Sequence, residues 1–195
     1  MRVIGLTGGI GMGKSTAAAA FRRARIPVFD ADREVHKLQA RGGAAVAPIA
    51  AAFPGTVRDG AVDRARLRAI VTADPAAFAR LEAIVHPLVR TEERRFLARA
   101  RRAGHRVAVL DIPLLFETGG DRRVDQVVVV TAPPDVQRAR VRLRRGVTEA
   151  QARALIARQM PDAEKRHRAD IVVRTGLSRH HAQRRLRGLI REMRR

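Results

Sequence analysis

The sequence of 195 residues contains no cysteine, asparagine, tryptophan or tyrosine. Without cysteine the chain forms no disulfide, no thiolate zinc site and no cysteine nucleophile, and we expect it to lie in the cytoplasm. Without asparagine it lacks the Asn-Lys-x-Asp type of motif that selects GTP. Six phenylalanines are its only large aromatic residues, which leaves few rings for stacking on single-stranded bases.

Long apolar runs are also missing. No run approaches the ~20 residues that a membrane span requires. Glycines and Lys14 interrupt the N-terminal apolar stretch between residues 8 and 15, before the apolar region of a signal peptide develops. We therefore expect no membrane partner.

Positive charge is abundant, because 40 Lys and Arg residues stand against 19 Asp and Glu residues, for a net charge of +21. Such an excess favours an anionic partner, which is nucleic acid, an acidic membrane or a phosphorylated small molecule. However, only Lys14, Lys37 and Lys165 are lysines. A coding bias toward arginine therefore explains the charge as well as a functional basic surface does.

Five short apolar runs predict the strands of a parallel sheet. None alternates between apolar and polar residues, and helical patterns separate them, as in an α/β fold with both sheet faces covered. The length suits one domain or one core with insertions. The predicted strands are Arg2–Thr7, Pro27–Phe29, Val107–Leu110, Val127–Val130 and Ile171–Val173.

Two helical excursions interrupt this order. The first carries helical patterns that end in a long segment from Pro75 to Ala103, which we expect His86-Pro87 to break or bend. The second, from Pro134 to Ala169, is rich in arginine and contains a capping box formed by Thr148 and Gln151. The other predicted helices are Lys14–Ala24, Ala44–Phe53, Asp63–Thr72 and a basic C-terminal helix from about Ser178.

The strongest motif is the run from Gly8 to Ser15, which fits the phosphate-binding pattern G-x-x-x-x-G-K-[ST]. Glycines let backbone N–H groups wrap a phosphate, and the following helix N-terminus adds its dipole. Lys14 is predicted to reach the β- and γ-phosphates of ATP, and Ser15 to ligate Mg²⁺. The predicted nucleotide-binding residues of this loop are Gly9, Ile10, Gly11, Met12, Gly13, Lys14, Ser15 and Thr16.

A short chain with two helical excursions is typical of a small-molecule kinase, in which one insert binds the acceptor and the other closes as a lid. The predicted fold class is α/β, with a five-stranded parallel P-loop kinase core, a helical substrate-binding insert and a helical lid. The core would take residues 1–32, 105–137 and 169–195. The insert would take 33–104, and the lid 138–168.

Transfer to a hydroxyl needs a carboxylate that orients the acceptor or takes its proton. Asp30 and Asp32 follow the second strand, at the sheet edge where open α/β folds bind ligands. The alternative for Asp32 is a helix cap. Asp111 ends the third strand and is a candidate for holding Mg²⁺ or its water, or else a turn residue.

Arg140 and Arg144 lie four residues apart, on one face of a predicted helix in the second excursion. There they would meet the triphosphate as a lid closes and stabilise charge in the transition state. The alternative is a solvated charged face.

Several motifs occur in the order found in one family. They are Gly-Gly-Ile-Gly-x-Gly-Lys-Ser, Asp-Ala-Asp, Leu-Glu-Ala-Ile-Val-His-Pro, Asp-Ile-Pro-Leu-Leu-Phe-Glu, and Gln-Met-Pro followed by Lys165. From Arg2 to about Gly176 the chain resembles dephospho-CoA kinases, which catalyse the last step of coenzyme A synthesis. The resemblance implies transfer of the ATP γ-phosphate to the ribose 3′-hydroxyl of dephospho-CoA, with Mg²⁺, giving coenzyme A and ADP.

The resemblance also implies roles for single residues. Asp32 matches the catalytic base, and Lys14 and Ser15 match the phosphate and Mg²⁺ positions. Arg140 and Arg144 match lid arginines. Met12 stands where the family usually has serine, and we expect its side chain to point away from the phosphate cradle. The motifs that line the acceptor site contain His86, Pro87, Leu114 and Glu117.

Two other functions remain open at this point. Another small-molecule or nucleoside monophosphate kinase would use the same loop with a different acceptor. A nucleic-acid-binding ATPase would explain the net charge of +21 and the basic C-terminal helix, and its binding would weaken steeply with salt. On the resemblance, ATP and dephospho-CoA are the expected partners and no nucleic acid is expected, while the oligomeric state is open.

Overall fold

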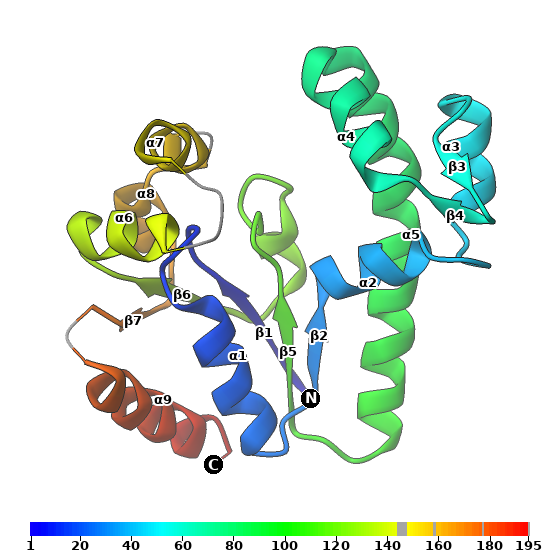
Figure 1. Ribbon diagram of the computed structural model, residues 1–195. Coiled ribbons are helices and arrows are strands. Elements are labelled where there is room, and N and C mark those ends of the chain that lie inside the picture. The colour runs from blue at the N-terminus through cyan, green and yellow to red at the C-terminus, as the bar shows by residue number, and fades with distance from the viewer. Residues whose placement is uncertain (144–147, 158, 177, 195) are drawn as a thin grey trace. The chain divides into compact units, whose positions relative to one another are not determined.

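A computed structural model describes residues 1–143, 148–157, 159–176 and 178–194 (Figure 1). The chain divides into two compact units, one of Met1–Phe29 with Ala100–Arg195 and one of Asp30–Arg99. The second unit thus begins three residues before the start of the predicted insert, 33–104, and ends five residues before the end of that insert. The described part of the predicted lid, 138–168, lies within the first unit.

A five-stranded sheet forms the centre of the first unit, with the order β2-β5-β1-β6-β7. Strand β1 pairs in parallel with β5 on one side and with β6 on the other, and β6 pairs in parallel with β7. The prediction of five parallel strands is confirmed, with ends that differ by one residue or none. The strands are β1 Arg2–Thr7, β2 Val28–Asp30, β5 Val107–Asp111, β6 Gln126–Thr131 and β7 Ile171–Arg174.

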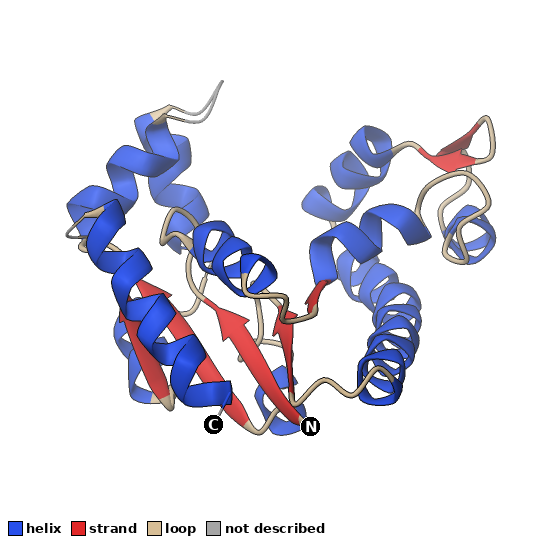
Figure 2. Cartoon of the chain, turned by 90° about the horizontal axis from the view of Figure 1, so that it is seen from below, coloured by secondary structure: helices blue, strands red, loops and turns tan. Residues whose placement is uncertain are grey.

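Both faces of the sheet are covered, which explains why the strands are continuously apolar. On one face Ile4 and Leu6 pack in a core with α1 (Lys14–Arg23) and α9 (Arg179–Arg194). Side chains alternate along a strand, so Gly5 faces the other way. There it lies so close to Leu115 that a Cβ atom would come within 2.8 Å of the leucine side chain. The core therefore extends to the segment that follows β5. Figure 2 shows the strands of the sheet with helices lying along them.

The second excursion contains three helices, α6 (Pro134–Arg142), α7 (Glu149–Ala157) and α8 (Asp162–His167). The predicted capping box is confirmed at the start of α7. Thr148 N donates to Gln151 Oε1 at 2.9 Å, and Gln151 N donates to Thr148 Oγ1 at 3.2 Å. A short 3₁₀ helix, η1 (Gly120–Arg123), precedes β6.

The unit of Asp30–Arg99 has its own core, which includes Leu38, Ile49, Phe53 and Leu67. Its helices are α2 Ala31–Leu38, α3 Val46–Ala52, α4 Arg64–Ala73 and α5 Pro75–Arg102, of which α5 continues into the first unit. Asp63 caps α4, because its Oδ1 accepts from the N–H groups of the first helical turn. Among the described residues, no helix is both long and apolar enough to cross a membrane.

A two-stranded hairpin that was not predicted from the sequence lies among the helices of this unit. Strands β3 (Val57–Arg58) and β4 (Ala61–Val62) pair antiparallel around Asp59 and Gly60. Both turn residues have positive φ, 52° and 77°, as the tight hairpin turn favoured by Asp-Gly requires. The Asp-Gly pair was therefore a readable hairpin signal.

Of the two outcomes expected at His86-Pro87, a break does not occur, because helix α5 continues from Pro75 to Arg102. A proline inside a helix removes one backbone hydrogen bond and costs about 3 kcal/mol. The apolar side chains of Val85, Leu88 and Val89 pack in the core of the unit on either side of Pro87. We attribute the unbroken helix to this burial, which offsets the local cost.

Replacing Phe21 by alanine is expected to destabilise the first unit by about 3–5 kcal/mol, because the fully buried ring of α1 would leave a cavity in the core. Urea denaturation measures the change in the free energy of unfolding. Phe78→Ala is the matched control, since the Phe78 side chain is exposed and should change stability by less than about 1 kcal/mol. Equal losses in the two variants would contradict this account of the core.

Candidate active site

The phosphate-binding loop lies between the end of β1 at Thr7 and the start of α1 at Lys14. Gly11 and Gly13 have φ values of 76° and 94°, which L side chains rarely adopt. Space is also restricted, because a Cβ atom on Gly13 would lie 3.1 Å from Thr175 Oγ1. Glycine is thus required both by the backbone conformation and by the neighbouring threonine.

Within the described part of the chain, nothing accepts a hydrogen bond from the N–H groups of Gly11, Gly13, Lys14 or Ser15. These donors stand at the N-terminus of α1, whose dipole favours negative charge. A loop of this kind binds phosphate through backbone N–H groups. The loop therefore has the geometry of an anion-binding site, as the sequence motif predicts. We call these four N–H groups the anion cradle.

The side chain of Met12 is buried in the core beside the sheet, with 2% of its surface exposed. Its sulfur accepts from the N–H of Ala132 at 3.0 Å. The expectation that Met12 points away from the cradle is confirmed, and the methionine anchors the loop in the core.

Lys14 and Asp111 form a short ion pair beside the loop, with 2.5 Å between Nζ and Oδ1. Asp111 is the buried last residue of β5, so strand pairing fixes the backbone that carries its carboxylate. Ser15, in contrast, is exposed in the first turn of α1. A hydroxyl and a carboxylate are the hard oxygen donors that Mg²⁺ prefers.

Helix α6 brings Arg140 to the phosphate loop. The guanidinium donates to the carbonyl of Gly11 at 3.3 Å and to Thr175 Oγ1 at 3.1 Å, and its other nitrogen donates to the Thr175 carbonyl at 2.8 Å. Arg140 thus contacts the loop directly, whereas its contact with the triphosphate stays a prediction. Arg144 lies outside the described residues.

Thr175 was not among the predicted site residues. Its hydroxyl donates to the carbonyl of Met12 at 2.6 Å and lies 3.2 Å from the carbonyl of Thr131, so it joins the loop to the end of β6. A lone threonine after a strand carries no signal in the sequence. Only the packing of the segment after β7 against the loop reveals it.

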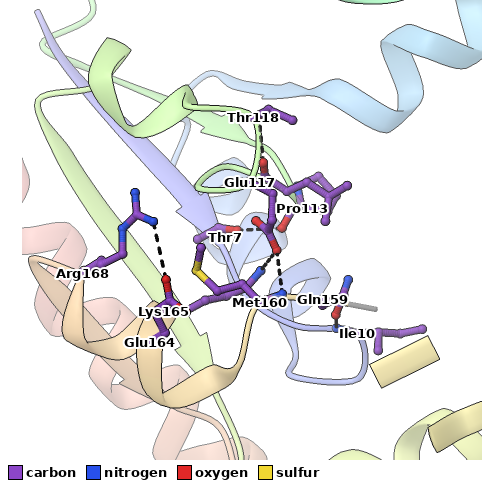
Figure 3. A network of polar contacts seen from close by, with 11 residues as sticks. Thr7, Ile10, Pro113, Glu117, Thr118, Gln159, Met160, Glu164, Lys165 and Arg168 are labelled. Atoms are coloured by element: carbon purple, nitrogen blue, oxygen red, sulfur yellow. Dashed lines mark hydrogen bonds and ion pairs between the residues drawn. The ribbon is translucent and has the colours of Figure 1, made fainter. Parts of the chain in front are cut away.

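Glu117, predicted to lie in the acceptor-site motif, is turned toward the end of the second excursion (Figure 3). Its Oε1 accepts from Lys165 Nζ at 2.7 Å and from Met160 N at 3.2 Å. The lysine side chain is almost completely buried, with 1% exposed. Leu114, in the same motif, is partly exposed at 38%.

Burial of the Glu117 carboxyl opposes its ionisation, yet the pKa of Glu117 lies below its ordinary value of 4.5. The hydrogen bond and the positive charge of Lys165 favour the carboxylate, as do backbone N–H groups of Glu117 and Met160. The carboxylate therefore stays charged and bound to Lys165 at neutral pH.

The remaining predicted residues belong to the unit of Asp30–Arg99. Asp30 caps α2, because its Oδ1 accepts from Arg33 N at 3.1 Å. Asp32 is exposed in the first turn of this helix, and within the described ranges its carboxylate has no hydrogen bond or ion pair. His86 and Pro87 lie on α5, where His86 Nε2 is 3.7 Å from Glu82 Oε1.

The lowered pKa of Glu117 predicts a loss of stability in acid. A carboxyl whose pKa is lower in the folded chain stabilises the fold above pH 4.5, its ordinary value, and this contribution is lost as the pH falls through the lowered pKa. Urea denaturation between pH 6 and pH 3 should show a smaller fall in unfolding free energy for Glu117→Gln than for the unchanged chain. Identical pH profiles would refute the assignment.

Comparison with known proteins places these features in one family. A model of dephospho-CoA kinases matches residues 2–187. A dephospho-CoA kinase of Mesorhizobium japonicum is 56% identical over 194 residues, which cover 100% of this chain and 98% of the relative. A dephospho-CoA kinase of Paramagnetospirillum magneticum is 63% identical over 166 residues, 85% of this chain and 78% of the relative.

Solved structures agree with this assignment. A Thermus thermophilus protein has a TM-score of 0.83 and 36% identity, covering 98% of this chain and 97% of its own. A dephospho-CoA kinase from Campylobacter jejuni has a TM-score of 0.75, with coverage of 100% and 98%, and at 22% identity it supports the fold alone. The α/β P-loop kinase fold is therefore confirmed, and the chain belongs to the dephospho-CoA kinase family.

Proposed function

We propose that the chain transfers the γ-phosphate of ATP to the ribose 3′-hydroxyl of dephospho-CoA, giving coenzyme A and ADP. The observation that carries this proposal is the anion cradle at the start of α1, in a chain that matches the dephospho-CoA kinase family over residues 2–187. The free N–H groups supply the donors that a triphosphate needs.

On this proposal Lys14 leaves Asp111 for the β- and γ-phosphates when the nucleotide binds, because a phosphate carries more negative charge than one carboxylate. The Ser15 hydroxyl would hold Mg²⁺, with Asp111 close enough to the loop to hold the metal or its water. Mg²⁺ supplies charge neutralisation at the phosphates when it is bound.

Asp32 is the proposed catalytic base. It accepts the proton of the 3′-hydroxyl while the hydroxyl oxygen forms a bond to the γ-phosphorus. The bond between the γ-phosphorus and the bridging oxygen breaks, and ADP leaves with that electron pair. The free carboxylate of Asp32 supports this role, since the cap of α2 is supplied by Asp30 instead.

The acceptor and lid assignments are parts of the same proposal. Residues 33–104 would form the CoA-binding insert, with His86, Pro87, Leu114 and Glu117 in the motifs that line the acceptor site. Residues 138–168 would form a lid that carries Arg140 and Arg144. Arg140 would stabilise transition-state charge, which its contact with the carbonyl of Gly11 supports. We also propose the cytoplasm as the location, where ATP and dephospho-CoA would be the substrates.

A coupled assay that detects ADP tests the function directly. ATP, Mg²⁺ and dephospho-CoA should together give stoichiometric ADP and coenzyme A. If ADP forms with a nucleoside monophosphate or a sugar and not with dephospho-CoA, the proposed acceptor is wrong. ATP turnover that depends on added DNA or RNA would instead favour a nucleic-acid-binding ATPase.

Lys14→Ala is expected to weaken ATP binding and to reduce turnover together, because it removes the cation proposed to reach the phosphates. Calorimetric titration with ATP and the coupled assay measure the two effects. Lys37→Ala is the control, since the exposed side chain of Lys37 pairs with Glu34 of the same helix, and the variant should leave both values near those of the unchanged chain. Normal ATP affinity in Lys14→Ala would refute the role of Lys14.

Asp32→Asn is expected to leave ATP affinity near normal and to lower kcat by about 10²- to 10⁴-fold, the usual contribution of a positioned acid or base. Asp30→Asn is a matched control two residues away, because asparagine caps helices as well as aspartate does. Its kcat should stay within a few-fold of the unchanged chain. Near-normal turnover in Asp32→Asn would remove Asp32 from the mechanism.

A further inference from the structure

The peptide groups on either side of Ile10, in the middle of the phosphate loop, are held by two glutamines. The N–H of Ile10 donates to Oε1 of Gln159 at 2.8 Å, and the carbonyl of Ile10 accepts from Nε2 of Gln137 at 2.9 Å. Because a backbone N–H only donates and a backbone carbonyl only accepts, each amide has one possible orientation. Gln159 presents its oxygen to the loop, and Gln137 presents its nitrogen.

The two glutamines come from different elements. Gln137 lies on α6 and is buried, with 7% exposed, whereas Gln159 follows α7. They bracket the arginine-rich part of the second excursion, and neither belongs to the phosphate-binding motif. The Gln-Met-Pro motif that contains Gln159 has no role in the mechanism proposed above.

The backbone next to Gln159 is held by a hydrogen bond to Glu117 (Figure 3). The next residue, Met160, donates its N–H to Glu117 Oε1, and the same oxygen accepts from the buried Lys165. Glu117 belongs to the segment after β5, and Lys165 to α8. The ion pair between Glu117 and the buried Lys165 thus fixes the backbone that places the Gln159 side chain.

We propose that Gln137 and Gln159 are positioning residues for the nucleotide, acting as a clamp on Ile10, with Glu117 and Lys165 as the brace of this clamp. The inference deepens the proposed function and rests on its ATP site. A glycine-rich loop is flexible, and ordering it around a triphosphate costs entropy. Fixing both peptide groups of Ile10 in advance removes part of that cost, which favours ATP binding.

Removal of either hydrogen bond should therefore weaken ATP binding. We expect Gln159→Met and Gln137→Met to raise the Kd for ATP about tenfold, which corresponds to about 1.4 kcal/mol. At saturating ATP, kcat should stay within about twofold, and the KM for dephospho-CoA should not change. Gln151→Met is the control, because Gln151 is exposed and, among the described residues, its side chain bonds only to Thr148 at the start of α7.

Hydrogen exchange of the Ile10 amide in the nucleotide-free protein tests the clamp directly. Gln159→Met should speed this exchange at least tenfold. Gln159→Glu should keep it slow, because a carboxylate oxygen still accepts from the Ile10 N–H. Gln137→Glu should lose its bond, since a carboxylate cannot donate to the Ile10 carbonyl, and the loop should again exchange faster. A general loss of structure would not distinguish the two glutamate variants.

Equal exchange rates in Gln159→Glu and Gln159→Met would overturn the clamp. Unchanged ATP Kd in both methionine variants would overturn its role in nucleotide positioning, as would an equal rise in Gln151→Met. The proposed acceptor is tested separately in the unchanged chain. If that chain binds ATP but does not phosphorylate dephospho-CoA, the proposed function fails while the ATP titrations still decide on the clamp.

Discussion

The fold depends on holding open a glycine loop in which four N–H groups, those of Gly11, Gly13, Lys14 and Ser15, have no acceptor in the described part of the chain. Unpaired donors cost free energy, so the loop must be anchored by other contacts. Met12 anchors the loop in the core. The Thr175 hydroxyl donates to the Met12 carbonyl of the loop and accepts from Arg140. The strand and helix on either side, β1 and α1, belong to the same buried cluster. Packing therefore supplies the rigidity, and the donors remain available for phosphate.

The lysines of this chain are also held in place by specific contacts. All three lysines of this arginine-rich chain form ion pairs, Lys14 with Asp111, Lys37 with Glu34 and Lys165 with Glu117. Lys14 and Lys165 occupy confined positions, where a compact ammonium fits and a planar guanidinium would need more room. The net charge of +21 first suggested nucleic acid. The proposed substrates, ATP and dephospho-CoA, are both polyanions. Binding them would explain part of the positive charge without a nucleic acid.

Local patterns predicted much of the architecture and missed two features of the insert. The five strands were readable because each is an apolar run buried on both faces. The hairpin around Asp59-Gly60 was missed although its turn signal is strong, because its strands are only two residues long. The continuity of α5 through Pro87 was not readable, since it depends on burial that offsets the cost of a proline.

By itself the sequence determined the phosphate loop, the parallel sheet and the family resemblance, because each rests on residue types at short, fixed spacings. It also placed Lys14 and Asp32 as chemical candidates. Only the tertiary structure paired Lys14 with Asp111 and turned Glu117 toward Lys165. It alone brought Gln137 and Gln159 to Ile10. These contacts join residues far apart in the chain, and a hydrogen bond depends on distance in space, which spacing along the sequence does not reveal.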